Sequence, residues 1–420
     1  MQIDLKYGSS YIQLKLDDKN VIGILELSKS TGIPDITKAE IEALIHPIGS
    51  KKLSEIAKGK MTACVEVSDY TRGTPYRRST YNLLLPLLDE LHKGGIRDEN
   101  IVFLIGTGSH RAHTEKENID NLGEEIVRNY QVISHDCDKN NISLGTLSTG
   151  NELLVDKVWI DADVRILTGL INTHYFGGFS GGRKGILPGI SGRETIRKNH
   201  ARILRPEVDI AKTKGNPISD EMDEAARKAG VDFILYVVVN EQKEIVKIVA
   251  GDLEKAFEEG RKACLDLYRV SFKEKADVVF ACAGGYPKDV SLYQSQKTIN
   301  NAKLVLKDGG TIVLISECKE GFGSDVFSRW LLEASSIDEL LNIDPAKITV
   351  GGHTAVGNAK VLKKFDILAI SSIQKEELEK RFYKYAEGME EALEWVKKKH
   401  GENFRSYVIP QAGFIYPCQV

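Results

Sequence analysis

Two loops of this sequence each carry a histidine directly after a run of apolar residues. Residues 101–105 precede the loop with His110, and residues 164–170 precede His174. In open α/β sheets, ligands bind beyond the carboxyl ends of the strands, where both histidines are expected. Because imidazole titrates near neutral pH, two such histidines can serve one substrate as acid and base. Either histidine taken alone is more often a turn-capping residue, but the glycine-rich loop that adjoins His174 favours a functional site.

That glycine-rich loop predicts close approach of the backbone to a ligand. Seven of the 37 glycines lie between Gly177 and Gly192, and Arg183 and Lys184 add positive charge. Glycine permits positive φ angles and close contacts, so the combination indicates an anionic ligand. The segment matches neither the G-x-x-x-x-G-K-[ST] nor the G-x-G-x-x-G phosphate pattern, which disfavours an ATP- or NAD-dependent enzyme. A flexible linker is also disfavoured, because aromatic and aliphatic residues are interleaved with the glycines.

Two further segments offer groups for an anion and for a metal. The loop after residues 61–67 carries an acid, a hydroxyl and a guanidinium in residues 69–72, which suits a phosphate or carboxylate but is also common in surface turns. Ser191 and Glu194 are spaced as a capping box, which predicts a helix that carries His200. Imidazole is a ligand for nickel, zinc and copper, although a lone histidine is more often a surface or core residue.

A last group lies near the start of a helix expected at residues 291–306. Tyr293, Gln294 and Lys297 are spaced i, i+1 and i+4, which places them on neighbouring parts of one helix face. A lysine and a glutamine there suit a carboxylate, whereas a solvated helix face is the usual explanation.

The elements that must position these groups alternate between short apolar strands and longer amphipathic segments. This rhythm predicts two α/β domains with largely parallel sheets and an active-site cleft between them. It restarts after residues 271–275, so we expect one domain over residues 1–272 and a second over residues 273–403. Residues 404–420 are a candidate for returning to the first domain. The turn at residues 148–151 predicts a β-hairpin.

Composition excludes several classes of protein. The 420 residues carry 57 Lys+Arg and 60 Asp+Glu, and the net charge of −3 argues against a nucleic-acid binder. The six cysteines show no zinc-site or disulfide spacing. No apolar stretch approaches the ~20 residues that span a bilayer, and the N-terminus lacks the order of a signal peptide. We therefore expect a cytoplasmic protein that makes no contact with a membrane.

These motifs together resemble the nickel-dependent lactate racemase family, and the resemblance runs through nearly the whole chain. The matching residues are Asp69, Tyr70, Thr71 and Arg72; residues 106–111 with His110; residues 172–185 with His174 and Lys184; His200; and Tyr293, Gln294 and Lys297. A set of ordered motifs across both expected domains is far more specific than any one of them.

The resemblance implies a nickel-pincer nucleotide, in which a pyridinium mononucleotide holds nickel through two thio-acyl arms and a ring carbon. Lys184 matches the lysine that forms a thioamide link to it, and like-charge repulsion from Arg183 would favour the deprotonated amine that attachment requires. His200 matches the histidine that completes nickel coordination, and residues 69–72 match the segment that holds the nucleotide. The resemblance also implies cofactor-biosynthesis proteins as partners in maturation.

The implied activity is racemisation of a 2-hydroxy acid, lactate or a related one, through a planar 2-oxo acid. His110 or His174 removes the hydroxyl proton while hydride passes to the cofactor, and the other histidine serves the opposite enantiomer. Tyr293, Gln294 and Lys297 would bind the substrate carboxylate. Two alternatives stay open, namely an epimerase of the same family for a larger hydroxy acid or sugar acid, and a noncatalytic carrier or sensor of the nickel nucleotide.

Overall fold

The computed structural model describes all residues, 1–420, and divides the chain into two compact units. Unit 2 is a continuous segment, Lys29–Leu267, whereas unit 1 combines Met1–Ser28 with Tyr268–Val420. The boundary at residue 268 lies close to the one expected at 272. The assignment of the N-terminus differs from expectation, because residues 1–28 belong with the C-terminal part of the chain.

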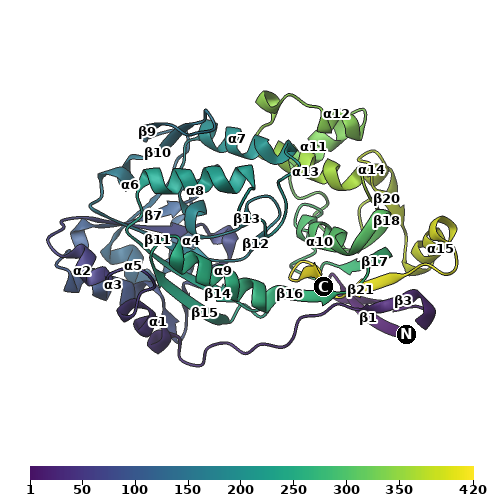
Figure 1. The fold of residues 1–420 in the computed structure, drawn as a ribbon, viewed down its shortest axis with the longest axis horizontal. Coiled ribbons are helices and arrows are strands. Elements are labelled where there is room, and N and C mark those ends of the chain that lie inside the picture. The colour runs from purple at the N-terminus through teal and green to yellow at the C-terminus, as the bar shows by residue number, and fades with distance from the viewer. The chain divides into compact units, whose positions relative to one another are not determined.

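Unit 2 is built on a six-stranded sheet in the order β15-β14-β11-β4-β7-β8 (Figure 1). All neighbours pair in parallel except β14 and β15, which are antiparallel. The bounds are β4 Ala63–Ser68, β7 Ile101–Gly106, β8 Gln131–Ser134, β11 Val164–Leu170, β14 Phe233–Val239 and β15 Ile245–Gly251. The expected hairpin is present as β9 (Asn141–Thr146) and β10 (Glu152–Asp156).

Helices cover both faces of this sheet. One face packs on α1 (Ile36–Ile45), α2 (Leu53–Ala57) and α3 (Leu84–Lys93) through a core that includes Val65 and Phe103. The short helix η4 (Gly182–Gly185) contacts the sheet at β4 and β11 and also contacts α8 (Pro217–Ala229). The remaining helices of unit 2 are α4 Glu115–Leu122, α5 Glu124–Asn129, α6 Lys157–Asp161, α7 Arg193–Ala201, α9 Lys255–Tyr268, η2 Tyr70–Arg72, η3 Asp98–Asn100 and η5 Arg202–Leu204. Two short hairpins complete the unit, namely β5 Arg77–Arg78 with β6 Tyr81–Asn82, and β12 Thr173–His174 with β13 Gly178–Phe179.

Unit 1 contains a second six-stranded sheet, in the order β20-β19-β18-β17-β21-β3, and every pair in it is parallel. The bounds are β3 Val21–Ile24, β17 Ala276–Cys282, β18 Leu306–Ile315, β19 Asp366–Ile370, β20 Lys384–Ala386 and β21 Ser406–Ile409. Strand β21 pairs with β17 on one side and with β3 on the other. Residues 404–420 therefore belong to unit 1 and do not return to the first domain, because β21 joins its six-stranded sheet and β22 pairs with β16 in a two-stranded sheet. The N-terminal strand β3 is the edge strand of the same sheet, which explains why residues 1–28 belong to this unit.

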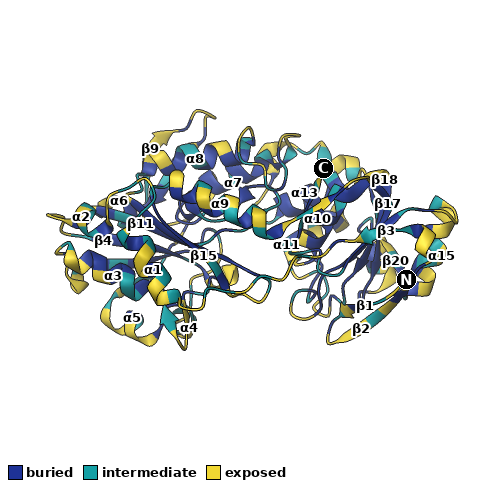
Figure 2. Cartoon of the chain, turned by 60° about the horizontal axis from the view of Figure 1, so that its bottom comes forward, coloured by how far each residue is buried: buried dark blue, intermediate teal, exposed yellow.

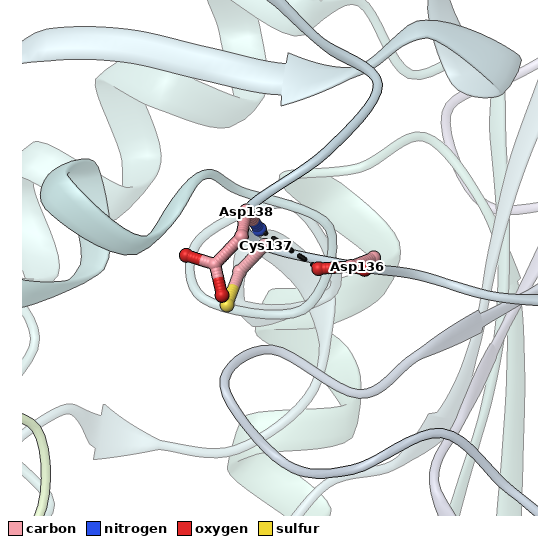
Figure 3. A group of neighbouring side chains, drawn as sticks. All are labelled: Asp136, Cys137 and Asp138. Atoms are coloured by element: carbon pink, nitrogen blue, oxygen red, sulfur yellow. Dashed lines mark hydrogen bonds between the residues drawn. The ribbon is translucent and has the colours of Figure 1, made fainter.

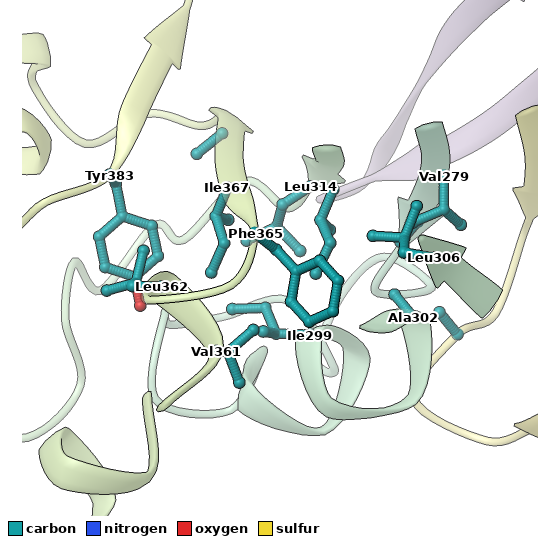
Figure 4. Packing of buried hydrophobic residues seen from close by; sticks show 14 of the residues in the cluster. Val279, Ile299, Ala302, Leu306, Leu314, Val361, Leu362, Phe365, Ile367 and Tyr383 are labelled. Carbon is teal, nitrogen blue, oxygen red and sulfur yellow. The ribbon is translucent and has the colours of Figure 1, made fainter. Parts of the chain in front are cut away.

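The sheet of unit 1 is covered on both faces as well. On one face, Ile299 and Ala302 of α10 (Gln296–Ala302) pack with Val279, Leu314 and other strand residues (Figure 4). On the other face, α15 (Met389–His400) and the hairpin of β1 (Gln2–Tyr7) and β2 (Ser10–Lys15) pack in a separate cluster. Figure 2 shows the central strands of both sheets buried, while helices such as α15 expose one side. The other elements are β16 Arg269–Phe272, β22 Tyr416–Gln419, α11 Asp325–Glu333, α12 Ile337–Leu341, α13 Gly352–Leu362, α14 Lys375–Glu379, η1 Asp18–Asn20, η6 Lys303–Val305 and η7 Pro345–Lys347.

Candidate active site

Three loops with polar side chains leave the carboxyl ends of three adjacent parallel strands. Asp69 follows β4, His110 lies in the loop after β7, and His174 lies in the hairpin after β11. Strand β4 lies between β11 and β7 in the sheet, so the three loops are neighbours. The placement of both histidines at this edge of one sheet, expected from the sequence, is confirmed.

Asp69 and His110 form a hydrogen-bonded pair across the first two loops. His110 Nδ1 lies 3.1 Å from Asp69 Oδ2, and the other carboxylate oxygen accepts from the backbone of Thr71 at 2.7 Å. Arg72 Nε is 3.5 Å from Asp69 Oδ2. Burial by itself would raise the pKa of Asp69, but the bond from His110, the charge of Arg72 and the bonds from Thr71 lower it to about 2.

The ionised carboxylate determines which tautomer His110 adopts. A carboxylate only accepts hydrogen bonds, so Nδ1 of His110 must carry the proton and Nε2 carries the lone pair. The His110 side chain is 45% exposed, whereas that of Asp69 is 2% exposed. The arrangement leaves a nitrogen that can take up a proton, backed by a buried negative charge that stabilises the imidazolium formed.

Tyr70 is held by two residues of the loop that carries His110. His113 Nε2 accepts from the backbone amide of Tyr70 at 3.2 Å, and the two rings pack edge to face with centroids 5.2 Å apart. Arg111 Nη2 donates to the Tyr70 hydroxyl at 3.2 Å and also pairs with Glu117 at 2.6 Å. Arg111 and His113 therefore fix the turn of residues 69–72. Nothing local in the sequence indicated this role.

Phe176 lies at the centre of a second group, formed by His174, Lys184 and His200. Its ring centroid is 4.4 Å from that of His174 and 4.9 Å from that of His200, and Lys184 Nζ lies 5.2 Å from its centre. A Cβ on Gly177 would lie 3.5 Å from His174 Nδ1 and 3.6 Å from Lys184 Nζ. The structure thus brings together three residues that the sequence had only placed at separate points along the chain.

His174 adopts the tautomer opposite to that of His110. The backbone amide of Gly177 donates to His174 Nδ1 at 3.2 Å. A nitrogen that accepts from an N–H carries the lone pair, so in neutral His174 the ring proton is on Nε2. In their neutral forms His110 therefore presents a hydrogen-bond acceptor at Nε2, and His174 presents a hydrogen-bond donor at Nε2.

His200 is buried on α7 and is oriented by its neighbour in the chain. Asn199 donates through Nδ2 to Glu221 Oε2 at 2.7 Å and to the Ile218 carbonyl at 3.2 Å, which turns its amide oxygen toward His200 Nδ1 at 3.2 Å. Nδ1 accordingly carries the proton, and Nε2 is the nitrogen suited to a metal. The helix begins differently than expected, because Gly192 is its N-cap and Ser191 Oγ donates to the Ile186 carbonyl.

Arg183 supports the glycine-rich loop and does not line an anion site beside Lys184. Its side chain is buried, donates to the Gly177 carbonyl at 2.9 Å and to Ser219 at 2.7 Å, and lies 3.0 Å from Asp223. It borders a cavity of about 200 Å³ together with residues of α8 and α9. Since its charge is balanced by Asp223, the expectation that Arg183 favours a deprotonated Lys184 by charge repulsion loses its basis.

In unit 1, Gln294 and Lys297 are both exposed near the start of α10. Tyr293 and Gln294 lie in the turn before the helix, which begins at Gln296, so the three residues do not share a helix face as expected. The turn is fixed by the Gln294 amide, which donates to Ser291 Oγ at 3.3 Å, and by the Tyr293 amide, which donates to the Phe322 carbonyl at 3.1 Å.

A closed network of buried amide and hydroxyl groups anchors this end of α10. Asn358 Nδ2 donates to Gln296 Oε1 at 2.8 Å, the Tyr383 hydroxyl donates to Asn358 Oδ1 at 2.9 Å, and Gln296 Nε2 donates to the Tyr383 hydroxyl at 3.3 Å. Buried networks in which each member is satisfied specify one geometry. The position of Lys297, one residue after Gln296, follows from this network.

Three potential metal ligands also lie together after β8, namely Asp136, Cys137 and Asp138 (Figure 3). Asp138 makes a bidentate ion pair with Arg193, at 2.7 Å for both bonds, and its backbone amide donates to Asp136 Oδ1 at 3.0 Å. Burial raises the pKa of the Cys137 thiol. A protonated thiol and a carboxylate already paired with arginine are poor metal ligands, so this cluster forms a turn that anchors the start of α7.

Comparisons with known proteins cover both units. A family model described as the lactate racemase N-terminal domain matches residues 7–211, and one described as the lactate racemase C-terminal domain matches residues 271–414. The chain is 37% identical to a lactate racemase of Thermoanaerobacterium thermosaccharolyticum over 81% of this chain and 80% of that protein. It is 32% identical to a lactate racemase of Lactiplantibacillus plantarum over 97% of each.

A solved structure of a lactate racemase is also similar to this chain. The lactate racemase apoprotein from Thermoanaerobacterium thermosaccharolyticum matches with a TM-score of 0.91 and 32% identity over 100% of both chains. None of the helices combines the length and apolar character that crossing a membrane requires. The chain therefore belongs to the lactate racemase family, and it is an isomerase.

Proposed function

We propose that this isomerase interconverts the two enantiomers of lactate, or of a closely related 2-hydroxy acid, and that His110 and His174 are its acid–base pair. The observation that carries the proposal is their opposite tautomers at neighbouring loops. Asp69 leaves a lone pair on Nε2 of His110, and the Gly177 amide leaves a proton on Nε2 of neutral His174. The named relatives support lactate as the first substrate to test.

In this proposal His110 Nε2 takes the proton of the substrate hydroxyl. Loss of that proton from the oxygen, and of a hydride from the carbon that bears the oxygen, leaves a planar 2-oxo acid. His174, converted to the imidazolium by taking up a proton from water at Nδ1, then donates its Nε2 proton to the carbonyl oxygen and ends neutral while the hydride returns to the opposite face. Because His110 is 45% exposed, it can release its proton to water before the next cycle. The opposite enantiomer requires the two histidines to exchange roles.

The hydride acceptor that we propose is a nickel-pincer nucleotide, which when bound supplies both the acceptor and the donor of the hydride. The residues present fit such a group. A Cβ on Gly177 would lie within contact distance of both His174 and Lys184, so the two side chains meet beside the same residue of the glycine-rich loop, where one bound group can reach both. His200 presents an imidazole nitrogen, a ligand that suits nickel.

Other residues would hold the nucleotide and the substrate. Asp69, Tyr70, Thr71 and Arg72 form a fixed turn in which the Arg72 guanidinium is 45% exposed and suited to a phosphate. Tyr293, Gln294 and Lys297 are proposed to bind the substrate carboxylate, and the exposure of Gln294 and Lys297 supports this. Cofactor-biosynthesis proteins are the proposed maturation partners.

The test uses holoprotein from its native cell and chiral chromatography of lactate. We expect either pure enantiomer to be converted to a mixture of both, and we expect His110→Ala and His174→Ala to abolish conversion while bound nickel stays nearly unchanged. His46→Ala, at an exposed position outside the loops, is the matched control and should be fully active. Activity in both histidine variants would refute the acid–base assignment.

The alternatives have distinct outcomes in the same experiment. A noncatalytic carrier would retain nickel and convert no substrate in the unmodified chain. An epimerase for larger substrates would leave lactate unchanged but convert malate, phenyllactate or a sugar acid. Intact mass of the Lys184 peptide tests the covalent link, since an unmodified peptide in fully active protein would exclude it.

A further inference from the structure

A buried acid lies directly beneath the loops that carry His110 and Lys184. Glu66 is 2% exposed in the middle of β4. Side chains alternate along a strand, and Val65 and Val67 face the core of α1, α2 and α3. Glu66 therefore points to the opposite face of the sheet, toward η4 and the glycine-rich loop. The proposed reaction gives this side chain no role.

Two glycines define the space that the Glu66 carboxyl group occupies. A Cβ on Gly106, at the end of β7, would lie 2.3 Å from Glu66 Oε1, and a Cβ on Gly185 would lie 2.8 Å from Glu66 Oε2. Both distances are shorter than real contacts, so a side chain at either position would force the Glu66 carboxyl group to move. The carboxyl group thus separates the two backbone segments and contacts both.

The two loops also contact each other above Glu66. The amide of Gly108 donates to the Gly189 carbonyl at 2.8 Å, and the amide of Gly189 donates to the Lys184 carbonyl at 3.0 Å. His110 lies two residues after Gly108. The spacing of the two loops therefore depends on the hydrogen bond between Gly108 and Gly189 and on the Glu66 carboxyl group between Gly106 and Gly185.

The surroundings of Glu66 favour its neutral form. Burial raises the pKa of Glu66 to about 8, with Asp69 also raising it, while a hydrogen bond from the Thr168 backbone and the charge of Arg72 act in the opposite direction. Oε2 has no hydrogen-bond partner. The hydroxyl groups of Tyr76 and Tyr236 face the same region, and burial raises their pKa as well. A neutral acid can fill this space, whereas an unpaired carboxylate there is costly.

We propose that Glu66 is a positioning residue whose neutral carboxyl group sets the separation between the His110 loop and the Lys184 loop. It contacts neither substrate nor cofactor in this proposal and acts only through Gly106 and Gly185. Its link to catalysis rests on the proposed function, but its effect on the loops can be measured on the apoprotein.

The first experiment compares hydrogen exchange in Glu66→Gln and Glu66→Ala apoprotein. Glutamine has the shape and neutrality of the protonated acid, so exchange in residues 107–111 and 182–189 should match that of the natural chain. Alanine empties the space, and we expect exchange of the same amides to accelerate by roughly tenfold or more. Glu40→Ala is the matched control, because Glu40 is also buried in unit 2 and both its carboxyl oxygens lack partners. This variant should leave the two loops unchanged.

A double variant tests the contact itself. Gly106 does not adopt a positive φ, and its next neighbour beyond Glu66 is Gly189 Cα at 3.5 Å, so only Glu66 excludes a methyl side chain at this position. Gly106→Ala alone should accelerate exchange in residues 107–111, and adding Glu66→Ala should reverse most of that effect. If Glu66→Ala does not fold, Glu66→Asp, which shortens the side chain by one methylene, replaces it and should show a smaller acceleration in the same loops.

The outcomes separate this proposal from the proposed function. Loop exchange that responds to Glu66→Ala but not to Glu66→Gln supports the positioning role even if lactate is not racemised. Equal exchange in all variants, or equal damage by alanine and glutamine, would overturn it. In holoprotein, we expect Glu66→Ala to lower kcat more than it raises KM, with recovery in Glu66→Gln.

Discussion

The ionisation of Glu66 should make the free energy of unfolding depend on pH. Burial raises the pKa of Glu66 from its ordinary value of 4.5 to about 8 in the folded protein. Between these values the unfolded chain releases a proton that the folded chain retains, so stability is greatest below pH 4.5 and is lost as the pH rises to 8. One pKa unit corresponds to about 1.36 kcal/mol, so the whole interval corresponds to about 5 kcal/mol.

Glu66→Gln removes this dependence because an amide does not ionise. The free energy of unfolding of the variant, relative to the natural chain, should therefore increase by about 1.4 kcal/mol for each pH unit. From pH 5.5 to 7.5 the expected gain is about 3 kcal/mol. This pH dependence comes only from the ionisation of Glu66 in the natural chain. A difference in unfolding free energy caused by the amide itself is the same at every pH and does not change the slope.

Urea unfolding of the apoprotein, followed by fluorescence, measures this difference for unit 2 alone. Trp159 is buried in unit 2 and donates to the carbonyls of Ala229 and Gly230, so its emission reports unfolding there. The other two tryptophans, Trp330 and Trp395, belong to unit 1 and are replaced by phenylalanine.

Glu55→Gln, at an exposed position of α2, is the control for the effect of the amide substitution itself. A pH-independent difference for Glu66→Gln over the same range would refute the reasoning, because it would mean that the folded chain holds Glu66 ionised.

Three further predictions concern other buried groups. Asp69→Asn should cost about 2 kcal/mol of stability at neutral pH, since the pKa of Asp69 is lowered from 3.8 to about 2, and this difference should vanish as the pH falls from 4 to 2 in urea titrations. The same variant should lower kcat, because His110 loses the carboxylate that fixes its tautomer. Glu40→Met should increase the free energy of unfolding by roughly 1–3 kcal/mol, because it removes a buried carboxyl group without partners. The thermal midpoint should therefore rise, and a lower midpoint would contradict this. Asn358→Leu should destabilise unit 1 by roughly 2–4 kcal/mol, measured by tryptophan emission from that unit, because it leaves two buried partners unpaired.

Local sequence patterns predicted the strands and loops of the site well. Strand β11 has the bounds expected from its apolar run, and the loops with His110 and His174 follow their strands as expected. These features depend on residues that are adjacent in the chain, where apolar runs and glycines mark the ends of strands. The same local reasoning was wrong for Tyr293 and Gln294, because tertiary contacts of the preceding turn delay the start of α10 until Gln296.

The sequence by itself determined which chemical groups are available and the order in which they follow the strands of a largely parallel α/β fold. Only the tertiary structure decided the protonation of His110, the burial of Arg183, the position of Glu66 beneath two glycines, and the pairing of β3 with β21. The physical reason is that each of these depends on a contact between segments distant in the chain, or on loss of water around a charge. Neither can be seen from the spacing of residues along one strand or helix.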